Sequence, residues 1–398
     1  MSEAVGNRRP DPSSLTGTAA RWEAEIGPIR ILFGGGRKGE AANLVGELGC
    51  CRVLLVSDPG IRAAGHLKEL QSALNQADLE FVTIDDVDEN PTSEQVEEGA
   101  VIAAAHKPDC IVALGGGSAM DCAKGINFLL TNGGKMADYW GFGRASEPLL
   151  PAIGIPTTAG TGSEAQSFAL ISDSASQRKM ACGDPKARFR AVILDPSLLA
   201  SAPPKVAAAS GLDAVSHAVE SFVTTQRNPV SRMLALQAWQ LLEQRLEESL
   251  ADEVSLQIRG QVLLAAHLAG AAIEQSMLGA AHACANPLTA AFGITHGQAV
   301  ALMLPHVVRF NAEVAEKDYQ DLASVAGLES STGGGNAVAS RIEEMSRRAD
   351  LPSRLQQLGV SGAELPVLAE AASLEWTARF NPRPVSQSEL QSLYESAF

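Results

Sequence analysis

One aspartate and three histidines are the residues of this sequence best suited to bind a metal ion. Asp213 and His217 lie four residues apart, so on a helix both side chains project from one face, a single turn apart. His282 and His296, separated by an Asn-Pro and a Phe-Gly pair, could complete the shell from neighbouring helices or turns. One carboxylate with three imidazoles suits iron(II) or zinc better than calcium or magnesium. The spacing therefore predicts a transition-metal site.

A glycine-rich turn is the second feature with a chemical use. It follows the apolar run 110–114 and opens a helical stretch that contains Asp121. Glycines at such a junction let the backbone approach a pyrophosphate, whose negative charge meets the free N–H groups at the helix start. The third glycine of the usual dinucleotide fingerprint is absent, and a tight turn with a serine N-cap is an equally good interpretation. The turn consists of Gly115, Gly116, Gly117 and Ser118.

A second polar loop, residues 155–164, follows another apolar run. Its four hydroxyl side chains and two glycines offer many hydrogen-bond donors and little apolar packing. A solvent-exposed capping loop would have the same composition. Two such loops at the carboxyl ends of parallel strands nevertheless favour ligand binding, because open α/β sheets bind their ligands at that edge.

These loops need a sheet that places them side by side, and residues 27–203 predict one. Short β-branched runs alternate there with helical stretches, which is typical of a parallel sheet covered on both faces. The expected strands are 29–34, 52–58, 80–86, 110–116, 149–157 and 191–196, and the expected helices are 38–49, 64–77, 93–107 and 118–132. Residues 1–26 are polar and without a clear period, so we expect a flexible N-terminal arm.

Residues 204–398 predict a second, all-helical domain. Long Ala- and Leu-rich amphipathic segments follow the Pro203-Pro204 pair, with almost no strand signal. The expected helices are 204–224, 228–249, 253–276, 296–314, 316–326, 335–349, 352–358, 362–373 and 386–397. No internal repeat has a fixed period, so a bundle fits better than a solenoid.

The composition narrows the range of partners. The chain has 398 residues, 45% of them hydrophobic and 19% charged, with a net charge of -15 that no basic run offsets. This balance argues against nucleic acid and anionic membranes as partners and favours small molecules. The six cysteines form no CxxC pair, the N-terminus lacks an apolar signal region, and no apolar run reaches the ~18 residues of a membrane span. We expect a cytoplasmic protein with free thiols.

Six motifs in chain order resemble those of the iron-containing, group III, alcohol dehydrogenase family. They are GGGSAMDCAK, IPTTAGTGSE, GLDAVSHAVES, the His-x13-His pair, ALMLPHVVRFN and FNPRPVSQSELQSLYESAF, and the match runs from about residue 28 to the C-terminus. The resemblance implies a Rossmann-like α/β nucleotide-binding domain, an all-helical metal-binding domain of the dehydroquinate synthase-like type, and an active site in the cleft between them.

The resemblance also assigns site residues. It implies that Asp213, His217, His282 and His296 bind the metal, most readily Fe2+ with Zn2+ as the alternative. It places Gly115, Gly116, Gly117, Ser118 and Asp121 at the pyrophosphate, and Thr157, Thr158 and Thr161 on the nicotinamide side. It places Asn90 and Pro91 in a turn beside the cofactor, and Lys179 near a cofactor ribose.

Asp58 occupies the position that faces the adenosine ribose in this family. A carboxylate there would accept a hydrogen bond from the 2'-hydroxyl and repel a 2'-phosphate, which favours NAD over NADP. Asp58 followed by Pro-Gly is also a good turn former, which is the plainer interpretation.

One position departs from the family pattern. Asn286 stands four residues after His282, where many relatives carry a second histidine near the substrate. An amide can orient a hydroxyl but cannot take up and release a proton near neutral pH. The proton would then have to pass to water or to a cofactor ribose hydroxyl. Phe168 and Trp376 are further candidates for the substrate pocket.

The implied activity is that of an NAD(H)-linked alcohol dehydrogenase or aldehyde reductase, an oxidoreductase in which hydride passes between a metal-bound alcohol and nicotinamide. A polyol-phosphate dehydrogenase or an NAD-using synthase on the same scaffold is an alternative, although the metal motifs lack a nearby cluster of Lys and Arg for a phosphate. A nucleotide-binding relative without turnover is another alternative. The family implies a homodimer or a larger homo-oligomer.

Overall fold

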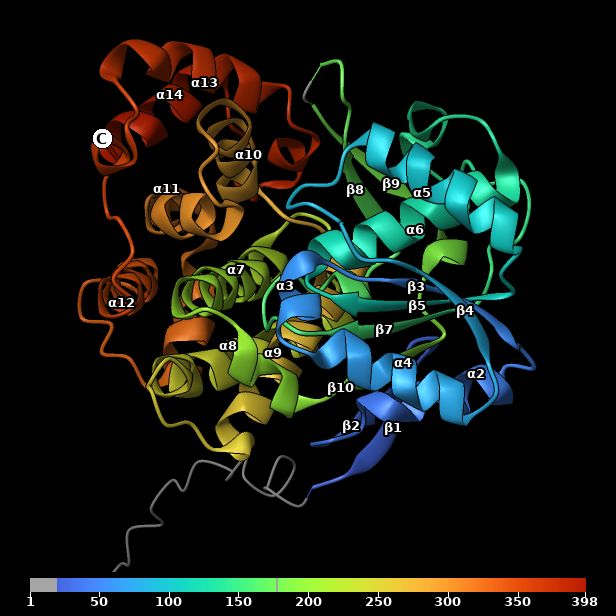
Figure 1. Cartoon of the computed structure of the whole chain (residues 1–398). Coiled ribbons are helices and arrows are strands. Elements are labelled where there is room, and N and C mark those ends of the chain that lie inside the picture. The colour runs from blue at the N-terminus through green and yellow to red at the C-terminus, as the bar shows by residue number, and fades with distance from the viewer. Residues whose placement is uncertain (1–19, 177) are drawn as a thin grey trace, which may run out of the picture.

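A computed structural model describes residues 20–176 and 178–398 (Figure 1). Most of the expected N-terminal arm, residues 1–19, lies outside the described residues. The end of that arm differs from the expectation, because Trp22–Ile26 forms strand β1, antiparallel to β2 (Ile29–Phe33). The Trp22 ring stacks on Phe33 with a centroid distance of 4.8 Å, and this contact gives the polar segment WEAEI an apolar anchor.

The predicted α/β sheet is present and has seven strands. Its order is β1-β2-β10-β7-β5-β3-β4, and every pairing beyond β1-β2 is parallel. The further strands are β3 (Arg52–Val56), β4 (Glu80–Ile84), β5 (Cys110–Gly115), β7 (Ala152–Pro156) and β10 (Ala191–Leu194). All six residues of β5 are buried, as expected of a central strand covered on both faces.

Helices cover both faces of this sheet (Figure 1). On one face, α2 (Ala41–Glu47), α3 (Pro59–Ala63) and α4 (His66–Gln76) pack against alternate strand side chains such as Val53 and Leu55. On the other face, α5 (Ser93–His106) and α6 (Gly117–Asn132) pack against Leu54 and Val56. The alternation of strand and helix in the sequence thus predicted this layer correctly.

A small second sheet was not predicted. It has the order β6-β9-β8, with β6 (Gly141–Phe142), β8 (Phe168–Ser172) and β9 (Lys179–Gly183). These strands are at most five residues long, and two of them mix buried with partly exposed positions, so they carry little strand signal. Short 3-10 turns lie at 38–40, 136–139, 163–165, 185–187, 196–201, 355–358, 362–364 and 376–380, and they are labelled η1 to η8 in that order.

The second half of the chain is helical, as expected. Its helices are α7 (Pro204–Val223), α8 (Pro229–Ser249), α9 (Leu256–Glu274), α10 (Ala280–Phe292), α11 (His296–Ala326), α12 (Gly334–Arg348), α13 (Leu365–Ser373) and α14 (Gln387–Ser396). Trp239 of α8 is fully buried, and its Nε1 donates to the Leu322 carbonyl at 3.0 Å. The expected helices 296–314 and 316–326 are both present as the two parts of α11, which meet at a kink where Ala315 has non-helical φ/ψ.

Helix α10 is a further element that the sequence failed to predict. Pro287 lies inside it and cannot donate a backbone hydrogen bond to the preceding turn, so the Asn-Pro pair was interpreted as a breaker. The helix persists because its first turns are buried, with Ala280 to Ala285 all in the core. This helix carries His282.

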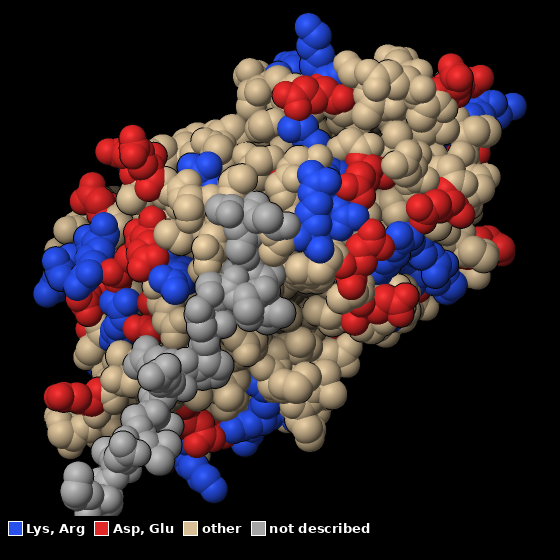
Figure 2. Space-filling model, turned by 90° about the horizontal axis from the view of Figure 1, so that it is seen from below, with Lys and Arg blue, Asp and Glu red and all other residues tan. Residues whose placement is uncertain are grey.

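Helix α9 joins the helical half to the loops of the sheet. It packs against η3 and η5, which follow β7 and β10. Its length and hydropathy would also suit a membrane span, but 78% of its most apolar window is buried inside the molecule, as in the core helix of a globular protein. On the face shown in Figure 2, Lys and Arg side chains lie interspersed among Asp and Glu side chains.

Candidate metal and cofactor site

The four predicted metal ligands converge from three helices. Asp213 and His217 lie one turn apart on α7, His282 lies in the first turn of α10, and His296 is the first residue of α11. The Nε2 atoms of the three rings lie 3.4 Å (His217), 3.6 Å (His282) and 3.9 Å (His296) from Asp213 Oδ1. The helix spacing and the distant histidine pair therefore meet at one point.

Three of these residues have the spacing of a divalent transition-metal site, and His296 Nε2 lies 3.9 Å from the Asp213 oxygen that they share. Ligand atoms of Asp213, His217 and His282 all lie within 4.8 Å of one another. Tetrahedral ligands at about 2.1 Å from a metal are about 3.4 Å apart, which is close to the spacing found here. Asp213 Oδ1 and His282 Nε2 are buried and have no hydrogen-bond partner among the described residues, so a bound cation would satisfy both.

Two neighbours orient the imidazoles. Glu220 Oε2 lies 2.5 Å from His282 Nδ1, and its Oε1 accepts the Ala281 backbone N–H at 2.8 Å. The Gly160 carbonyl lies 3.2 Å from His217 Nδ1. A hydrogen on each Nδ1 leaves Nε2 free for a metal, and such partners commonly tune metal affinity. The sequence analysis missed both. The spacing 213, 217, 220 would have placed Glu220 on the same face of the helix, whereas a backbone carbonyl leaves no signal.

The electrostatics of the shell favour a cation. Burial alone would raise the pKa of Asp213, but the neighbouring rings of His217, His282 and His296 hold it below its usual range. Burial opposes the charged form of His282 as well, yet Glu220 and Asp213 raise its pKa to about 9. Two buried carboxylates thus draw positive charge to this point, and a divalent metal can supply it in place of protons.

The shell is open on one side. The side chains of Asp213, His217 and His282 are each 5% exposed, whereas that of His296 is 25% exposed. A metal held by these residues would therefore be reached past His296. Catalytic metal sites keep such an open position for substrate.

The glycine turn forms a cradle at the end of β5. Helix α6 begins at Gly117, and its N-cap residue Gly116 makes no side-chain capping bond. The alternative interpretation, with Ser118 as N-cap, is therefore wrong; Ser118 Oγ instead accepts the Asn90 backbone N–H at 3.3 Å. A Cβ on Gly117 would lie 2.8 Å from Thr161 Cγ2, so only glycine lets the two loops come this close.

Asp121 faces the protein interior. It is 8% exposed, and its Oδ1 accepts the Ser163 hydroxyl at 2.5 Å. Lys124 is also buried, and its Nζ donates to the carbonyls of Ser163 and Phe168, both at 2.7 Å. These two α6 side chains tie the glycine turn to the segment that follows the threonine loop. Their place in the site is thus to position loops.

Glu164 and His267 form a second buried pair, which holds the end of the threonine loop. Glu164 Oε1 lies 3.1 Å from Nδ1 of His267, a fully buried residue of α9 that the sequence gave no reason to place here. Nearby, Glu274 accepts from the backbone N–H and hydroxyl of Ser167 and from Arg188. Loop residues 157–164 are therefore fixed to both halves of the molecule.

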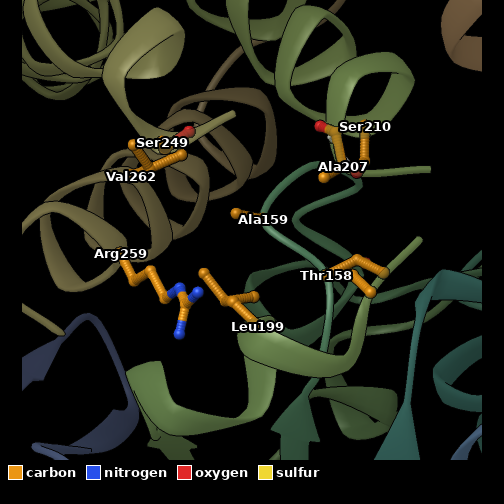
Figure 3. A pocket seen from close by; sticks show the side chains of 9 residues that line it. Thr158, Ala159, Leu199, Ala207, Ser210, Ser249, Arg259 and Val262 are labelled. Carbon is orange, nitrogen blue, oxygen red and sulfur yellow. Dashed lines mark hydrogen bonds between the residues drawn. The ribbon is translucent and has the colours of Figure 1, made fainter. Parts of the chain in front are cut away.

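The predicted cofactor residues follow four neighbouring strands. Asp58 follows β3 and caps α3, since its Oδ1 accepts the Ile61 N–H at 3.0 Å; a Cβ on Gly115 would lie 2.8 Å from its Oδ2. Burial raises the pKa of Asp58. Thr157 follows β7, and its backbone N–H donates to the Gly115 carbonyl at 3.0 Å. Thr158 lines a small pocket with Leu199 and with Arg259 of α9 (Figure 3).

Lys179 lies beside the Asn90-Pro91 turn. It is the first residue of β9, and its Nζ donates to Asn90 Oδ1 at 3.3 Å. Asn90 has φ +57°, and the carbonyl of the buried Pro91 accepts from the Ser172 N–H. Burial lowers the pKa of Lys179, while Asp121 and Asp213 act in the opposite direction. Its charge therefore interacts with both parts of the site.

Asn286 lies one turn beyond His282 on α10. Its Nδ2 donates to Glu375 Oε2 at 2.8 Å, a partner that the sequence analysis missed. Trp376, which follows Glu375, packs against Phe168 of β8 with a centroid distance of 5.7 Å and the rings tilted by 31°, so the two proposed pocket aromatics do meet. Phe168 also contacts Phe142, which is 59% exposed. An aromatic series thus leads from the neighbourhood of α10 to the surface.

Comparisons with known proteins agree with this geometry. Residues 28–196 match the family described as iron-containing alcohol dehydrogenase, and residues 207–398 match its C-terminal domain. Alcohol dehydrogenase 4 of Schizosaccharomyces pombe is 35% identical over 372 residues, which cover 93% of this chain and 88% of the relative. An NAD-dependent methanol dehydrogenase of Bacillus methanolicus is 29% identical over 93% of this chain and 98% of its own length. A crystal structure of 1,3-propanediol oxidoreductase has a TM-score of 0.90 at 31% identity, covering 95% of this chain and 99% of that one. The chain belongs to the iron-containing alcohol dehydrogenase family.

Proposed function

We propose that this oxidoreductase is a reversible, metal-dependent alcohol dehydrogenase or aldehyde reductase that uses NAD(H). The observation that carries the proposal is the convergence of three imidazole Nε2 atoms within 3.4 to 3.9 Å of one carboxylate oxygen, together with a glycine turn at the end of a parallel strand. The names of the relatives, a methanol dehydrogenase and a 1,3-propanediol oxidoreductase, suggest small alcohols and aldehydes as substrates.

The proposed metal is Fe2+, with Zn2+ as the alternative, held by Asp213, His217, His282 and His296. Such a metal supplies Lewis acidity toward the oxygen of the alcohol or aldehyde. Glu220 and the Gly160 carbonyl fix the ring orientations of His282 and His217. The open side at His296 admits the substrate oxygen, and the neighbourhood of Asn286 receives the rest of the molecule.

The proposed cofactor is NAD, which accepts or donates the hydride. Its pyrophosphate would lie on the backbone of the glycine turn, with Lys179 and the Asn90-Pro91 turn beside a ribose. The free Oδ2 of Asp58 would accept from an adenosine 2'-hydroxyl and disfavour the 2'-phosphate of NADP. The residues assigned to this cofactor are Asp58, Asn90, Pro91, Gly115, Gly116, Gly117, Ser118, Asp121, Thr157, Thr158, Thr161 and Lys179, with Asp121 acting indirectly.

The domain organisation of the chain supports separate sites for the cofactor and the metal. We propose a nucleotide-binding domain at 27–203 and a metal-binding domain at 204–398, and the two family matches leave the stretch 197–206 between them. We also propose a cytoplasmic homo-oligomer whose partners are small molecules.

Elemental analysis of protein purified without added metal, followed by an NAD-coupled screen, tests this function. We expect about one iron or zinc per chain and NADH formation with at least one short alcohol or diol, or NADH consumption with an aldehyde. Stoichiometric NADH binding without turnover across the panel would contradict the proposal and favour a non-catalytic nucleotide-binding protein.

A further inference from the structure

Oxidation of an alcohol by NAD+ releases a proton as well as a hydride, and the proton needs an acceptor. Two of the three shell imidazoles are committed, because His282 Nδ1 contacts Glu220 and His217 Nδ1 contacts the Gly160 carbonyl. Nδ1 of the third, His296, is buried and has no hydrogen-bond partner among the described residues. Asp121 is buried against Ser163. Asn286 cannot titrate near neutral pH. Besides water and a cofactor ribose hydroxyl, a further side chain close to Asn286 can therefore accept the proton.

Glu375 is such a side chain. Asn286 follows His282 by one turn and thus lies on the same face of α10, and it donates to Glu375 Oε2 at 2.8 Å. Lys179, whose Nζ donates to Asn90 Oδ1 at 3.3 Å, is one of the positive charges that act on the Glu375 carboxyl. No hydrogen bond within the described residues occupies the second oxygen of Glu375. That oxygen is available to a hydroxyl or a water molecule.

The surroundings of Glu375 suit a group that gains and loses a proton. Glu375 is partly exposed, so it can exchange a proton with solvent. Burial raises its pKa, whereas the Asn286 amide and the positive charges of Arg178 and Lys179 act against that rise. The buried phenol of Tyr394 on α14 is the other titratable group close to it. A raised carboxyl pKa lies nearer to neutrality, which improves a general acid or base.

We infer that Glu375 is the general base for alcohol oxidation and the general acid for aldehyde reduction. This inference rests on the proposed dehydrogenase function. As the hydroxyl proton passes to the Glu375 carboxylate, directly or through one water, the electron pair of the carbinol C–H bond leaves as hydride to NAD+ and the carbonyl forms. Glu375 then returns the proton to solvent through its exposed edge. The reverse sequence protonates the oxygen formed when NADH reduces an aldehyde.

The alternative is that the Asn286–Glu375 hydrogen bond is purely structural and holds η8 against α10. Glu375→Gln separates the two roles, because glutamine still offers an oxygen to Asn286 Nδ2 but cannot titrate. We expect kcat for alcohol oxidation to fall by roughly 100-fold or more. Because the base must be ionised, the wild-type rate should decline as pH falls through the Glu375 pKa, and this acidic limb should vanish in E375Q. Metal content and NADH affinity should remain, and Glu375→Asp should recover part of the rate.

Glu370→Gln is the matched control, since Glu370 is an exposed residue of α13, and it should behave as wild type. Equal rates and pH profiles in E375Q and wild type would overturn the inference. A wild-type protein that oxidises no alcohol would instead contradict the proposed function.

A second measurement needs no turnover and remains available if E375Q fails to fold. In protein labelled with 13C at glutamate carboxyls, one resonance, assigned by Glu375→Asp, should titrate above the ordinary range of glutamate. It should shift when trifluoroethanol, an alcohol that gives up hydride poorly, is added to the metal-loaded NAD+ complex. An ordinary titration with no response to trifluoroethanol would overturn the inference.

Discussion

The cofactor cradle and the metal shell are built in different ways. The cradle collects residues at neighbouring strand ends of one parallel sheet, and its donors are largely backbone groups of the glycine turn. The shell collects four side chains from three helices, and its most buried ligand, Asp213, depends on residues up to 83 positions away (296 minus 213). A local turn sets the first site, and long-range helix packing sets the second.

This difference predicts different sensitivities. The cradle depends on the space beside a few glycines, so added volume should harm it while leaving the metal in place. The shell depends on the identity and orientation of side chains, so a change of one functional group should release the metal while leaving NADH binding in place. Four substitutions test that contrast, from the largest expected effect to the smallest.

His282→Ala should break the shell alone. Loss of one imidazole leaves three ligands and frees Glu220, so we expect bound metal to be lost and turnover to fall by roughly a thousand-fold, on the order of 4 kcal/mol. The fold and much of the NADH affinity should survive. Elemental analysis, turnover and NADH fluorescence titration measure the three quantities. His306→Ala, a histidine that contacts Ser396 outside the shell, is the control. Full activity of metal-free H282A would refute the shell.

Glu220→Gln should weaken the shell without removing a ligand. The carboxylate 2.5 Å from His282 Nδ1 becomes a neutral amide, so the imidazole is a poorer donor to the metal. We expect metal affinity or activity to fall by roughly 10- to 100-fold, measured by competition with a chelator. Glu248→Gln, an exposed partner of Arg245, should leave metal affinity unchanged. An equal loss in both variants would show that orientation by Glu220 is unimportant.

Gly117→Ala should act mainly on the cradle. The new methyl group would lie 2.8 Å from Thr161 Cγ2, and the threonine loop would have to move. Overpacking of this kind costs about 1 to 3 kcal/mol, so we expect the NADH Kd to rise by roughly 10-fold. Metal content should fall less, although the same loop carries the Gly160 carbonyl beside His217. Gly46→Ala in α2 is the control, because its added Cβ meets nothing within 4 Å. A loss of metal in G117A as large as the loss of NADH affinity would contradict the separation of the two regions.

Asp58→Ser should weaken the preference of the cradle for NAD over NADP. Serine keeps the N-cap of α3 but removes the negative charge expected at the adenosine ribose. We expect the ratio of kcat/KM for NADP over NAD to rise by about 3- to 10-fold, with thermal stability nearly unchanged. An unaltered ratio would assign Asp58 to capping alone.

The same contrast explains what could be read from the sequence. The alternation of strand and helix predicted six of the seven strands of the main sheet, and the glycine turn lay where it was expected. The missing strand, β1, has a polar sequence and is held by the Trp22–Phe33 stack, which no local pattern encodes. Helix α10 was missed because Pro287 suggested a break and burial of the first turns overrides it.

Within the site, the sequence predicted the side chains that carry the chemistry better than those that support them. Asp213 and His217 share a helix face, so their proximity follows from spacing alone. The contacts Glu220–His282, Glu164–His267 and Asn286–Glu375 span 62, 103 and 89 positions, and they depend on how helices pack. Local periodicity does not predict such long-range contacts.

The most direct test of this account compares NADH affinity and turnover in one preparation before and after its metal is removed. The account predicts that chelation lowers turnover to background, that added Fe2+ restores it, and that the NADH Kd changes by less than about threefold, equivalent to about 0.7 kcal/mol. Full turnover by protein shown to be metal-free, or loss of NADH binding together with the metal, would contradict it.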